Sequence, residues 1–181
     1  MIMDPNKLII IIVSLFLICY GSQVFALSDS DFQAVGRKYG VSPYLLQAIS
    51  LVESQDGELL GQYKVCEVAD NPQLKFLEKI ARHTGRPISE FKGSTAGAMG
   101  HMQIMPATFY EYAQDGDGDG IRDPLNPYDS LATAAYFLAR SIAIQGGTRA
   151  ALKKYNNSEV YCQKVLEWYR KIELESQFAS R

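Results

Sequence analysis

Apolar residues recur at helical spacing in one segment after another, and this pattern most restricts the folds that the sequence can form. Most of these segments begin at Ser, Thr or Pro or end at Gly, which are residues that start and stop helices. No alternating pattern of useful strand length is present, and residues 55–71 are polar and irregular. Residues 92–106 are expected to form a loop with a little strand. The sequence predicts a mainly α architecture, with helices within residues 28–40, 42–54, 74–85, 106–113, 131–146, 148–155 and 158–172.

The length of the chain and its N-terminal segment indicate how many domains the protein has and where it acts. A chain of 181 residues with 47% hydrophobic content can bury one substantial core, which favours one compact domain. An apolar stretch, residues 8–20, follows Lys7, and Val24-Phe25-Ala26 places small residues where a signal peptidase reads. We expect a signal peptide at residues 1–26, cleaved after Ala26, and a domain at residues 27–181 that is periplasmic or secreted. The alternative is an uncleaved segment that anchors the protein in a membrane.

Charge and cysteine content further restrict partners and compartment. The net charge of −2 shows no basic excess, so nucleic acid is not an expected partner. Cys19 would leave with the signal peptide, and Cys66 and Cys162 would meet oxidising conditions. We predict a Cys66–Cys162 disulfide that ties the loop after residue 54 to the last helix. The alternative is two reduced, buried thiols, because sequence spacing does not report distance.

Glu53 is the acidic residue best placed to perform chemistry. At about 100° per residue, Leu45, Leu46, Ile49 and Val52 occupy one arc of their helix, and Glu53 projects within that arc. Desolvation at the edge of the core should raise its pKa and keep it protonated, as a general acid requires. The alternative is a solvated or ion-paired glutamate at a helix end.

A Gly-rich segment, Gly97-Ala98-Met99-Gly100-His101-Met102-Gln103-Ile104-Met105-Pro106, offers a place for a substrate. Its glycines allow backbone to approach a ligand closely, and its methionines can form an adaptable apolar floor. Gln103 supplies both a hydrogen-bond donor and an acceptor. Alone this segment could be an ordinary tight connection, but together with Glu53 it favours an enzyme site.

Three motifs together resemble those of the lytic transglycosylases and goose-type lysozymes. They are Glu53-Ser54, residues 97–108 and Tyr155-Asn156, and the resemblance covers about residues 30–172. It implies a mainly α, lysozyme-like single domain with minimal strand and a cleft between helical lobes. It also implies peptidoglycan glycan strands as the partner and no cofactor for catalysis. In this family one glutamate acts as acid and then as base, cleaving the β-1,4 bond between MurNAc and GlcNAc with formation of a 1,6-anhydro-MurNAc end.

The resemblance assigns roles to individual residues of the site. Glu53 is the catalytic group, whereas the expected substrate-binding residues are Ser54, Met102, Gln103, Tyr155 and Asn156. His101 departs from the commonest pattern, where a large apolar residue or Pro stands. The nearby Asp56 and Glu58 are interpreted as solvated loop acids. We expect a monomer.

Two other functions remain open on the sequence. One is a hydrolytic goose-type lysozyme on the same fold, which would release a reducing sugar. The other is a non-catalytic, calcium-binding module that holds peptidoglycan without cutting it.

An acidic loop has the spacing of a calcium site. Residues 115–120, Asp-Gly-Asp-Gly-Asp-Gly, place carboxylates at every second position and glycine at the sixth. The twelfth position is Asn126 instead of the usual Glu. The loop is similar to a longer one in the membrane-bound lytic transglycosylase B type, whose last carboxylate is at the fifteenth position. The predicted ligands of a structural Ca²⁺ are Asp115, Asp117, Asp119, the carbonyl of Ile121 and Asp129. The alternative is a solvated acidic turn that binds no ion.

Overall fold

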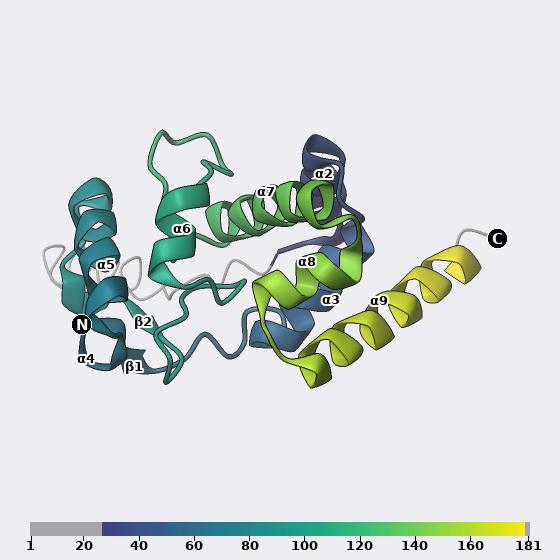
Figure 1. The fold of residues 1–181 in the computed structure, drawn as a ribbon. Coiled ribbons are helices and arrows are strands. Elements are labelled where there is room, and N and C mark those ends of the chain that lie inside the picture. The colour runs from purple at the N-terminus through teal and green to yellow at the C-terminus, as the bar shows by residue number, and fades with distance from the viewer. Residues whose placement is uncertain (1–26, 180–181) are drawn as a thin grey trace, which may run out of the picture.

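The computed structural model describes residues 27–179 and confirms the mainly α architecture (Figure 1). The predicted signal peptide lies outside the described residues. The elements, in chain order, are α2 (Asp29–Tyr39), α3 (Pro43–Ser54), β1 (Tyr63–Lys64), α4 (Val65–Val68), α5 (Asn71–Thr84), the 3₁₀ turn η1 (Ile88–Glu90), β2 (Lys92–Gly93), α6 (Pro106–Tyr112), α7 (Pro127–Gln145), α8 (Thr148–Tyr155) and α9 (Glu159–Ala179).

The residues that flank the helices explain where several of them begin and end. Ser28 forms a capping box with Asp31 at the start of α2, and Gly40 ends that helix in the left-handed conformation. Pro43 occupies the first position of α3, although the Ser42 side chain makes no capping hydrogen bond. At the far end of the chain, the Tyr161 N–H donates to Ser158 Oγ, as expected of an N-cap.

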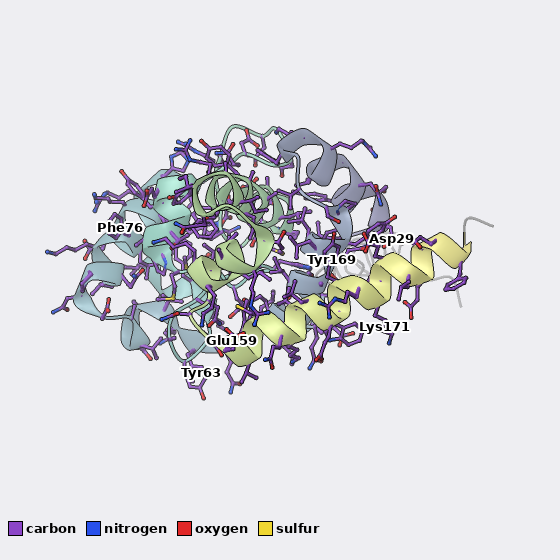
Figure 2. The ribbon with its side chains drawn as sticks, turned by 45° about the vertical axis from the view of Figure 1, so that its right-hand side comes forward. Asp29, Tyr63, Phe76, Glu159, Tyr169 and Lys171 are labelled. Atoms are coloured by element: carbon purple, nitrogen blue, oxygen red, sulfur yellow. The ribbon has the colours of Figure 1, made fainter. Side chains whose placement is uncertain are left out.

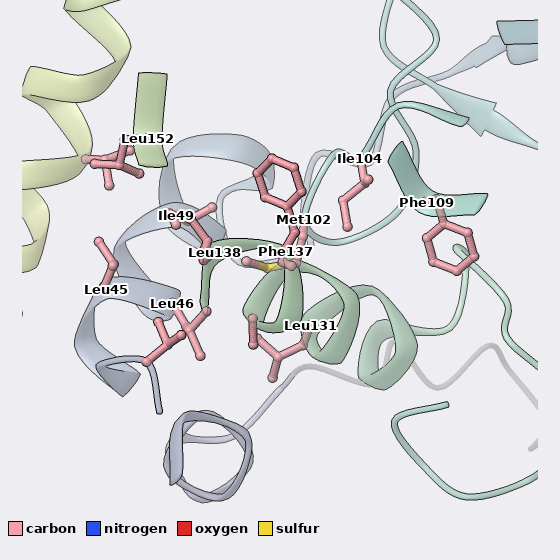
Figure 3. Close-up of a cluster of buried hydrophobic side chains, with 14 of the residues drawn as sticks. Leu45, Leu46, Ile49, Met102, Ile104, Phe109, Leu131, Phe137, Leu138 and Leu152 are labelled. Carbon is pink, nitrogen blue, oxygen red and sulfur yellow. The ribbon is translucent and has the colours of Figure 1, made fainter. Parts of the chain in front are cut away.

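Helix α7 forms the centre of the core. Its middle section is almost entirely buried: Leu131, Ala134, Ala135 and Leu138 are fully buried, and Tyr136 is half-buried. Figure 3 shows Leu131 and Leu138 facing the side chains of Leu45, Leu46 and Ile49 on α3. A helix apolar on all sides is covered by other elements on all sides. In α7, small alanines let these neighbours approach closely.

A short antiparallel sheet contains the little strand expected within residues 92–106, but its other strand was not predicted. Residues 55–71 were expected to be irregular, but they contain β1 and α4. Strand β1 pairs with β2 through Tyr63↔Gly93 and Lys64↔Lys92. Two residues per strand are too few for an alternating pattern to show in the sequence. The Gly-rich segment continues this pairing through single bridges between Gly93 and Met99 and between Met99 and Ile104.

Helix α9 covers one side of the molecule. It packs against α3 and α8 with its predicted apolar face, burying Tyr161 and Val165. Figure 2 shows α9 along the surface, beginning near Glu159, while Phe76 of α5 lies at the opposite end of the molecule. None of the helices within residues 27–179 combines the length and apolar character that crossing a membrane requires.

Candidate active site

The end of α3 places Glu53 at the edge of the core, as predicted. Leu45, Leu46 and Ile49 on the same arc are fully or almost fully buried, and Glu53 itself is half-buried. The chain then reverses in a left-handed turn, because Gln55, Asp56 and Gly57 all have positive φ angles of 49°, 59° and 92°. This turn ends the helix at Ser54, one residue after Glu53, and leaves the Glu53 carboxyl group in the last turn of the helix.

Burial raises the pKa of the Glu53 carboxyl from its ordinary value of 4.5 to about 7. The hydroxyl of Tyr161 lies near enough to oppose this rise, although its oxygen is buried without a hydrogen bond of ordinary geometry. Among the described residues, Tyr161 is the side chain that lowers the Glu53 pKa. A carboxyl group with this pKa is still substantially protonated near neutral pH, which suits a general acid.

Tyr155 and Tyr161 form a stacked pair beside Glu53. Their rings are 4° from parallel with centroids 6.4 Å apart, and Phe137 packs edge-on against Tyr155 at 5.6 Å. Burial, together with the negative charge of Glu53, raises the pKa of both phenols. Both hydroxyl groups therefore remain neutral, and the Tyr155 hydroxyl donates to the Met102 carbonyl at 2.6 Å. This bond joins the end of α8 to the Gly-rich segment.

The Gly-rich segment forms a tight turn against the start of α7. Gly100 has a φ of 70°, and a Cβ there would lie 1.9 Å from the Pro124 carbonyl oxygen. The Met102 N–H donates to Ser130 Oγ at 3.0 Å. Gln103 also has a positive φ, 45°, and its amide donates to the carbonyls of Gly100 and Leu60. The turn is thus fixed from both sides.

A small pocket opens between this turn, α6 and α8. Its walls, which we call the cleft pocket, are Gln103, Ile104, Met105, Thr108, Phe137, Lys154 and Tyr155. Of the residues expected to bind substrate, Gln103 and Tyr155 line it. Asn156 is exposed at the C-terminal end of α8.

Ser54 and Met102 stabilise the Gly-rich turn from its buried side. The side chains of Met99 and Met102 are fully buried. Of the three methionines expected to form an apolar floor, Met105 is therefore the one that lines the pocket. Ser54 is also buried; its hydroxyl donates to the His101 carbonyl at 2.7 Å and accepts from the Gly57 N–H at 2.8 Å. Neither side chain is exposed to a ligand.

A buried polar cluster links the turn after α3 to the Gly-rich segment. The Ser50 hydroxyl lies 2.7 Å from His101 Nε2 and donates to Asp56 Oδ1 at 2.6 Å, while Asp56 Oδ1 is 3.2 Å from the same histidine nitrogen. These bonds lower the pKa of Asp56. The interpretation of Asp56 as a solvated loop acid is incomplete: its side chain is 41% exposed, but its carboxylate is also held by two partners. Glu58 is exposed, as expected.

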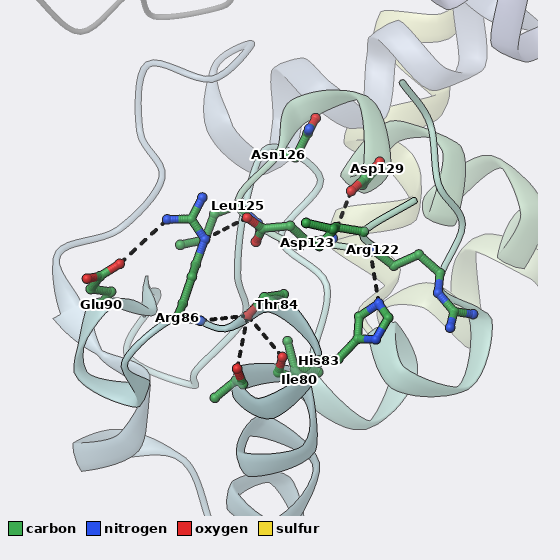
Figure 4. Close-up of polar contacts among 12 residues, drawn as sticks. Ile80, His83, Thr84, Arg86, Glu90, Arg122, Asp123, Leu125, Asn126 and Asp129 are labelled. Carbon is green, nitrogen blue, oxygen red and sulfur yellow. Dashed lines mark hydrogen bonds and ion pairs between the residues drawn. The ribbon is translucent and has the colours of Figure 1, made fainter. Parts of the chain in front are cut away.

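The acidic loop brings three of its predicted ligands together. Carboxylate oxygens of Asp115, Asp117 and Asp129 all lie within 4.8 Å of one another. Asp129 is fully buried and accepts from the Gly116 N–H at 2.7 Å. It also accepts from the Asp123 N–H at 2.8 Å (Figure 4). Burial, reinforced by the charges of Asp117 and Asp115, raises the pKa of Asp129 to about 6.

Asp119 stands outside this group, and the fifth predicted ligand, the Ile121 carbonyl, is on the exposed stretch that follows it. Asp119 Oδ1 accepts from the Ile121 N–H at 2.7 Å, and both residues are exposed. The fit to a hard cation therefore rests on three clustered carboxylates whose mutual repulsion is not offset by any cationic side chain paired with them among the described residues.

The predicted disulfide is wrong for this structure. Cys66 and Cys162 are both free thiols, half-buried and buried respectively. Cys66 is in α4, which packs against β1, α5 and η1, whereas Cys162 is in α9, which packs against α3 and α8. The two helices lie in different parts of the fold (Figure 1), and sequence spacing could not reveal this.

The sequence profile described as the transglycosylase SLT domain matches residues 11–150. Because this match covers most of the chain, the protein belongs to the transglycosylase SLT domain family. Among curated proteins it is similar to the membrane-bound lytic murein transglycosylase B of Escherichia coli (strain K12), with 29% identity over 116 residues. That alignment covers 56% of this chain and 32% of the relative, so the chain spans about a third of that protein's length.

Solved structures confirm the lysozyme-like transglycosylase fold. The Escherichia coli lytic transglycosylase Slt35 in complex with calcium has a TM-score of 0.72 at 19% identity, covering 81% of this chain and 70% of that one. Soluble lytic transglycosylase SltB1 from Pseudomonas aeruginosa has a TM-score of 0.72 at 20% identity, covering 82% and 75%. SltB3 from the same organism, in complex with NAG-NAM-pentapeptide, has a TM-score of 0.70 at 24% identity, covering 80% and 60%.

Proposed function

We propose that this protein is a peptidoglycan lytic transglycosylase that uses Glu53 as its single acid and base. The observation that carries the proposal is the half-buried Glu53 carboxyl group with its pKa near 7, held beside Tyr155 and Tyr161. Family membership supports the same reaction, and so does the similarity to lytic transglycosylases. Glu53 protonates the oxygen that bridges MurNAc and GlcNAc, and an oxocarbenium-like centre develops at the sugar.

The second half of the reaction returns the proton to Glu53. Its carboxylate takes the proton of the MurNAc 6-hydroxyl, and that oxygen closes the 1,6-anhydro ring, so no external water is consumed. A second catalytic carboxylate is not needed. The nearest acidic neighbour in sequence, Asp56, supports this assignment because Ser50 and His101 already hold it. Gln103, Tyr155 and Asn156 contact the glycan, while Ser54 and Met102 keep the turn in place.

Product masses from purified peptidoglycan test the proposal. We expect glycan ends that are lighter by one water than those released by a hydrolytic lysozyme, and no products from Glu53→Gln. Reducing ends from the unaltered protein would identify the hydrolytic alternative. Glycan binding without cleavage by either protein would identify a non-catalytic module.

We also propose a structural Ca²⁺ in the acidic loop. The Slt35 structure is a complex with calcium, and the three clustered carboxylates of this chain have the chemistry that Ca²⁺ prefers. Asp115, Asp117 and Asp129 would hold the ion, with Asp119 and the Ile121 carbonyl as further oxygen donors. When bound, the ion supplies positive charge that offsets the repulsion among the carboxylates and braces the loop between α6 and α7.

A substrate in the cell wall requires the protein to act outside the cytoplasm. We propose that it acts as a monomer in the periplasm or after secretion, following cleavage near Ala26, and that an uncleaved segment would hold it at the membrane. The substrate and the family membership support this placement. Sizing the mature protein by light scattering and sequencing its N-terminus test the two parts separately.

A further inference from the structure

We propose that a basic pocket, on the face of α6 away from the cleft pocket, binds the carboxylate groups of the peptidoglycan stem peptide. This inference rests on the proposed function, because it identifies a second recognition site for the same substrate. The basic pocket is a cavity between α5 and α6, closed at one end by the chain after the acidic loop. Its lining includes Lys79, Arg82, His83, Phe109, Tyr110 and Arg122.

The walls of the basic pocket carry positive charge and no carboxylate. Lys79, Arg82 and Arg122 contribute three cations, although the protein as a whole has a net charge of −2. Within residues 27–179, none of these three makes an ion pair with an acidic side chain. Cations gathered in a concave site without acidic partners attract an anionic ligand.

The floor and the remaining polar groups suit a peptide. Phe109 and Ile80 are almost completely buried and form an apolar base, and the Tyr110 ring is exposed above it. Lys79 Nζ lies 4.9 Å from the centroid of that ring, which holds the ammonium group at the rim. An apolar floor with cations at its edge can hold an amino-acid side chain and its carboxylate together.

His83 adds a directed hydrogen-bond donor. The Arg122 N–H donates to His83 Nε2 at 3.2 Å, so the lone pair of the ring is on that nitrogen (Figure 4). The proton of the neutral ring is therefore on Nδ1, where it can be donated to a ligand oxygen. The same bond fixes the segment that carries Arg122 against α5.

The position of the basic pocket relative to the cleft pocket identifies the ligand. Thr108 of α6 lines the cleft pocket, whereas Phe109 and Tyr110 line the basic pocket, so the two sites lie on different faces of one helix. Passing from one face of a helix to the other means going around half its circumference, roughly 16 to 19 Å for a helix about 10–12 Å across. An extended peptide of five residues spans about 17 Å. A pentapeptide attached to MurNAc in the cleft pocket is therefore long enough to bring its terminal carboxylate to the cations.

Binding measurements on the Glu53→Gln protein test the inference without turnover. The probes are GlcNAc-MurNAc-pentapeptide and the same disaccharide without peptide. We expect the pentapeptide compound to bind more tightly, and Lys79→Gln with Arg122→Gln to weaken its binding by about tenfold. Binding of the peptide-free disaccharide should not change. The matched control replaces two exposed lysines outside the pocket, Lys75→Gln with Lys164→Gln, and should leave both affinities unchanged.

The outcomes separate this inference from the proposed function. Unchanged affinity of the pocket variant for the pentapeptide compound would overturn the inference, and so would an equal loss for both probes. Inorganic phosphate that binds the pocket in preference to the pentapeptide would also overturn it, by assigning the pocket to a phosphate group. Failure of the proposed function has a different signature: the unaltered protein would then cut neither intact peptidoglycan nor glycan strands stripped of peptide.

Discussion

At the scale of single residues, the environment of Glu53 controls the chemistry. The carboxyl group is desolvated by the core of α3 and receives little compensation from polar neighbours, since the Tyr161 hydroxyl opposes the pKa rise only in part. A raised carboxyl pKa means that folding favours the protonated form. Keeping Glu53 in this desolvated place therefore lowers the free energy of unfolding of the protein at neutral pH.

Glu53→Gln should make this cost visible. The unaltered protein loses stability as pH rises through the interval from 4.5 to about 7, because the folded state resists ionisation of Glu53. The glutamine variant lacks this loss, so we expect it to be more stable by about 1 to 3 kcal/mol at pH 8 and equally stable at pH 4. Urea unfolding at both pH values measures the difference. Glu58→Gln, at an exposed position, serves as the control; a pH-independent effect of Glu53→Gln would contradict the assignment.

Tyr161→Phe should shift the pH dependence of cleavage. The hydroxyl lowers the Glu53 pKa, so its removal raises that pKa further and keeps the acid protonated at higher pH. The alkaline limb of the activity profile is then expected to move to higher pH, with the fold intact. Tyr169→Phe on the same helix is the comparison variant. An alkaline limb that stays in place, or moves to lower pH, would argue against a direct effect of the hydroxyl on Glu53.

At the scale of elements, the helices were predictable and the connections between them were not. The apolar spacing and the flanking Ser, Pro and Gly residues locate α2, α3 and α7 because those signals are local. The arc of α3 likewise predicts the placement of Glu53. Strand β1 and helix α4 were missed because each is very short and depends on pairing or packing with β2 and α5.

Two parts of the site depended on tertiary contacts that no local pattern encodes. The cluster of Ser50, Asp56 and His101 joins residues 45 and 51 positions apart, so Asp56 could not be distinguished from a solvated acid. The unusual His101 was the available signal, because a buried polar side chain requires partners. The basic pocket was likewise hidden, since its cations come from α5 and from the chain after the acidic loop.

Gly100 allows the Gly-rich turn to approach the backbone of Pro124, just before α7, and a substitution can test this contact. Gly100→Ala would place a Cβ 1.9 Å from the Pro124 carbonyl oxygen at a φ of 70°, so we expect a loss of about 3 kcal/mol or more. Gly146→Ala is the matched control, because its φ of 80° imposes the same left-handed strain but no atom lies within 4 Å of the added Cβ. Its cost should be about 1 kcal/mol. Equal costs would show that contact with Pro124 does not restrict the turn.

At the scale of the whole molecule, the acidic loop connects α6 to the central helix α7. It runs from α6 to α7, and Asp129 at the start of α7 is completely buried. An ion bound there would stabilise the folded state by an amount that rises with the logarithm of its concentration, because the unfolded chain does not assemble the three carboxylates. Global stability therefore reports on occupancy of the loop.

Calcium in large excess should raise the melting temperature by about 5 to 10 °C over that in chelator. Asp129→Asn should abolish this increase, since it removes the buried member of the cluster. Asp119→Asn should retain most of it, because Asp119 stands outside the group of three carboxylates. Differential scanning calorimetry of the unaltered protein and both variants, each with ion and with chelator, makes the comparison. A melting temperature insensitive to both ion and chelator would remove the case for calcium.

The hydrogen bond from Tyr155 to the Met102 carbonyl joins residues 53 positions apart in the sequence. Tyr161, which lowers the Glu53 pKa, follows later still. A chain emerging from the ribosome consequently exposes Glu53 long before it acquires the aromatic partners that complete the candidate site. The proposed active site is therefore incomplete until residue 161 has been synthesised and has packed beside Glu53.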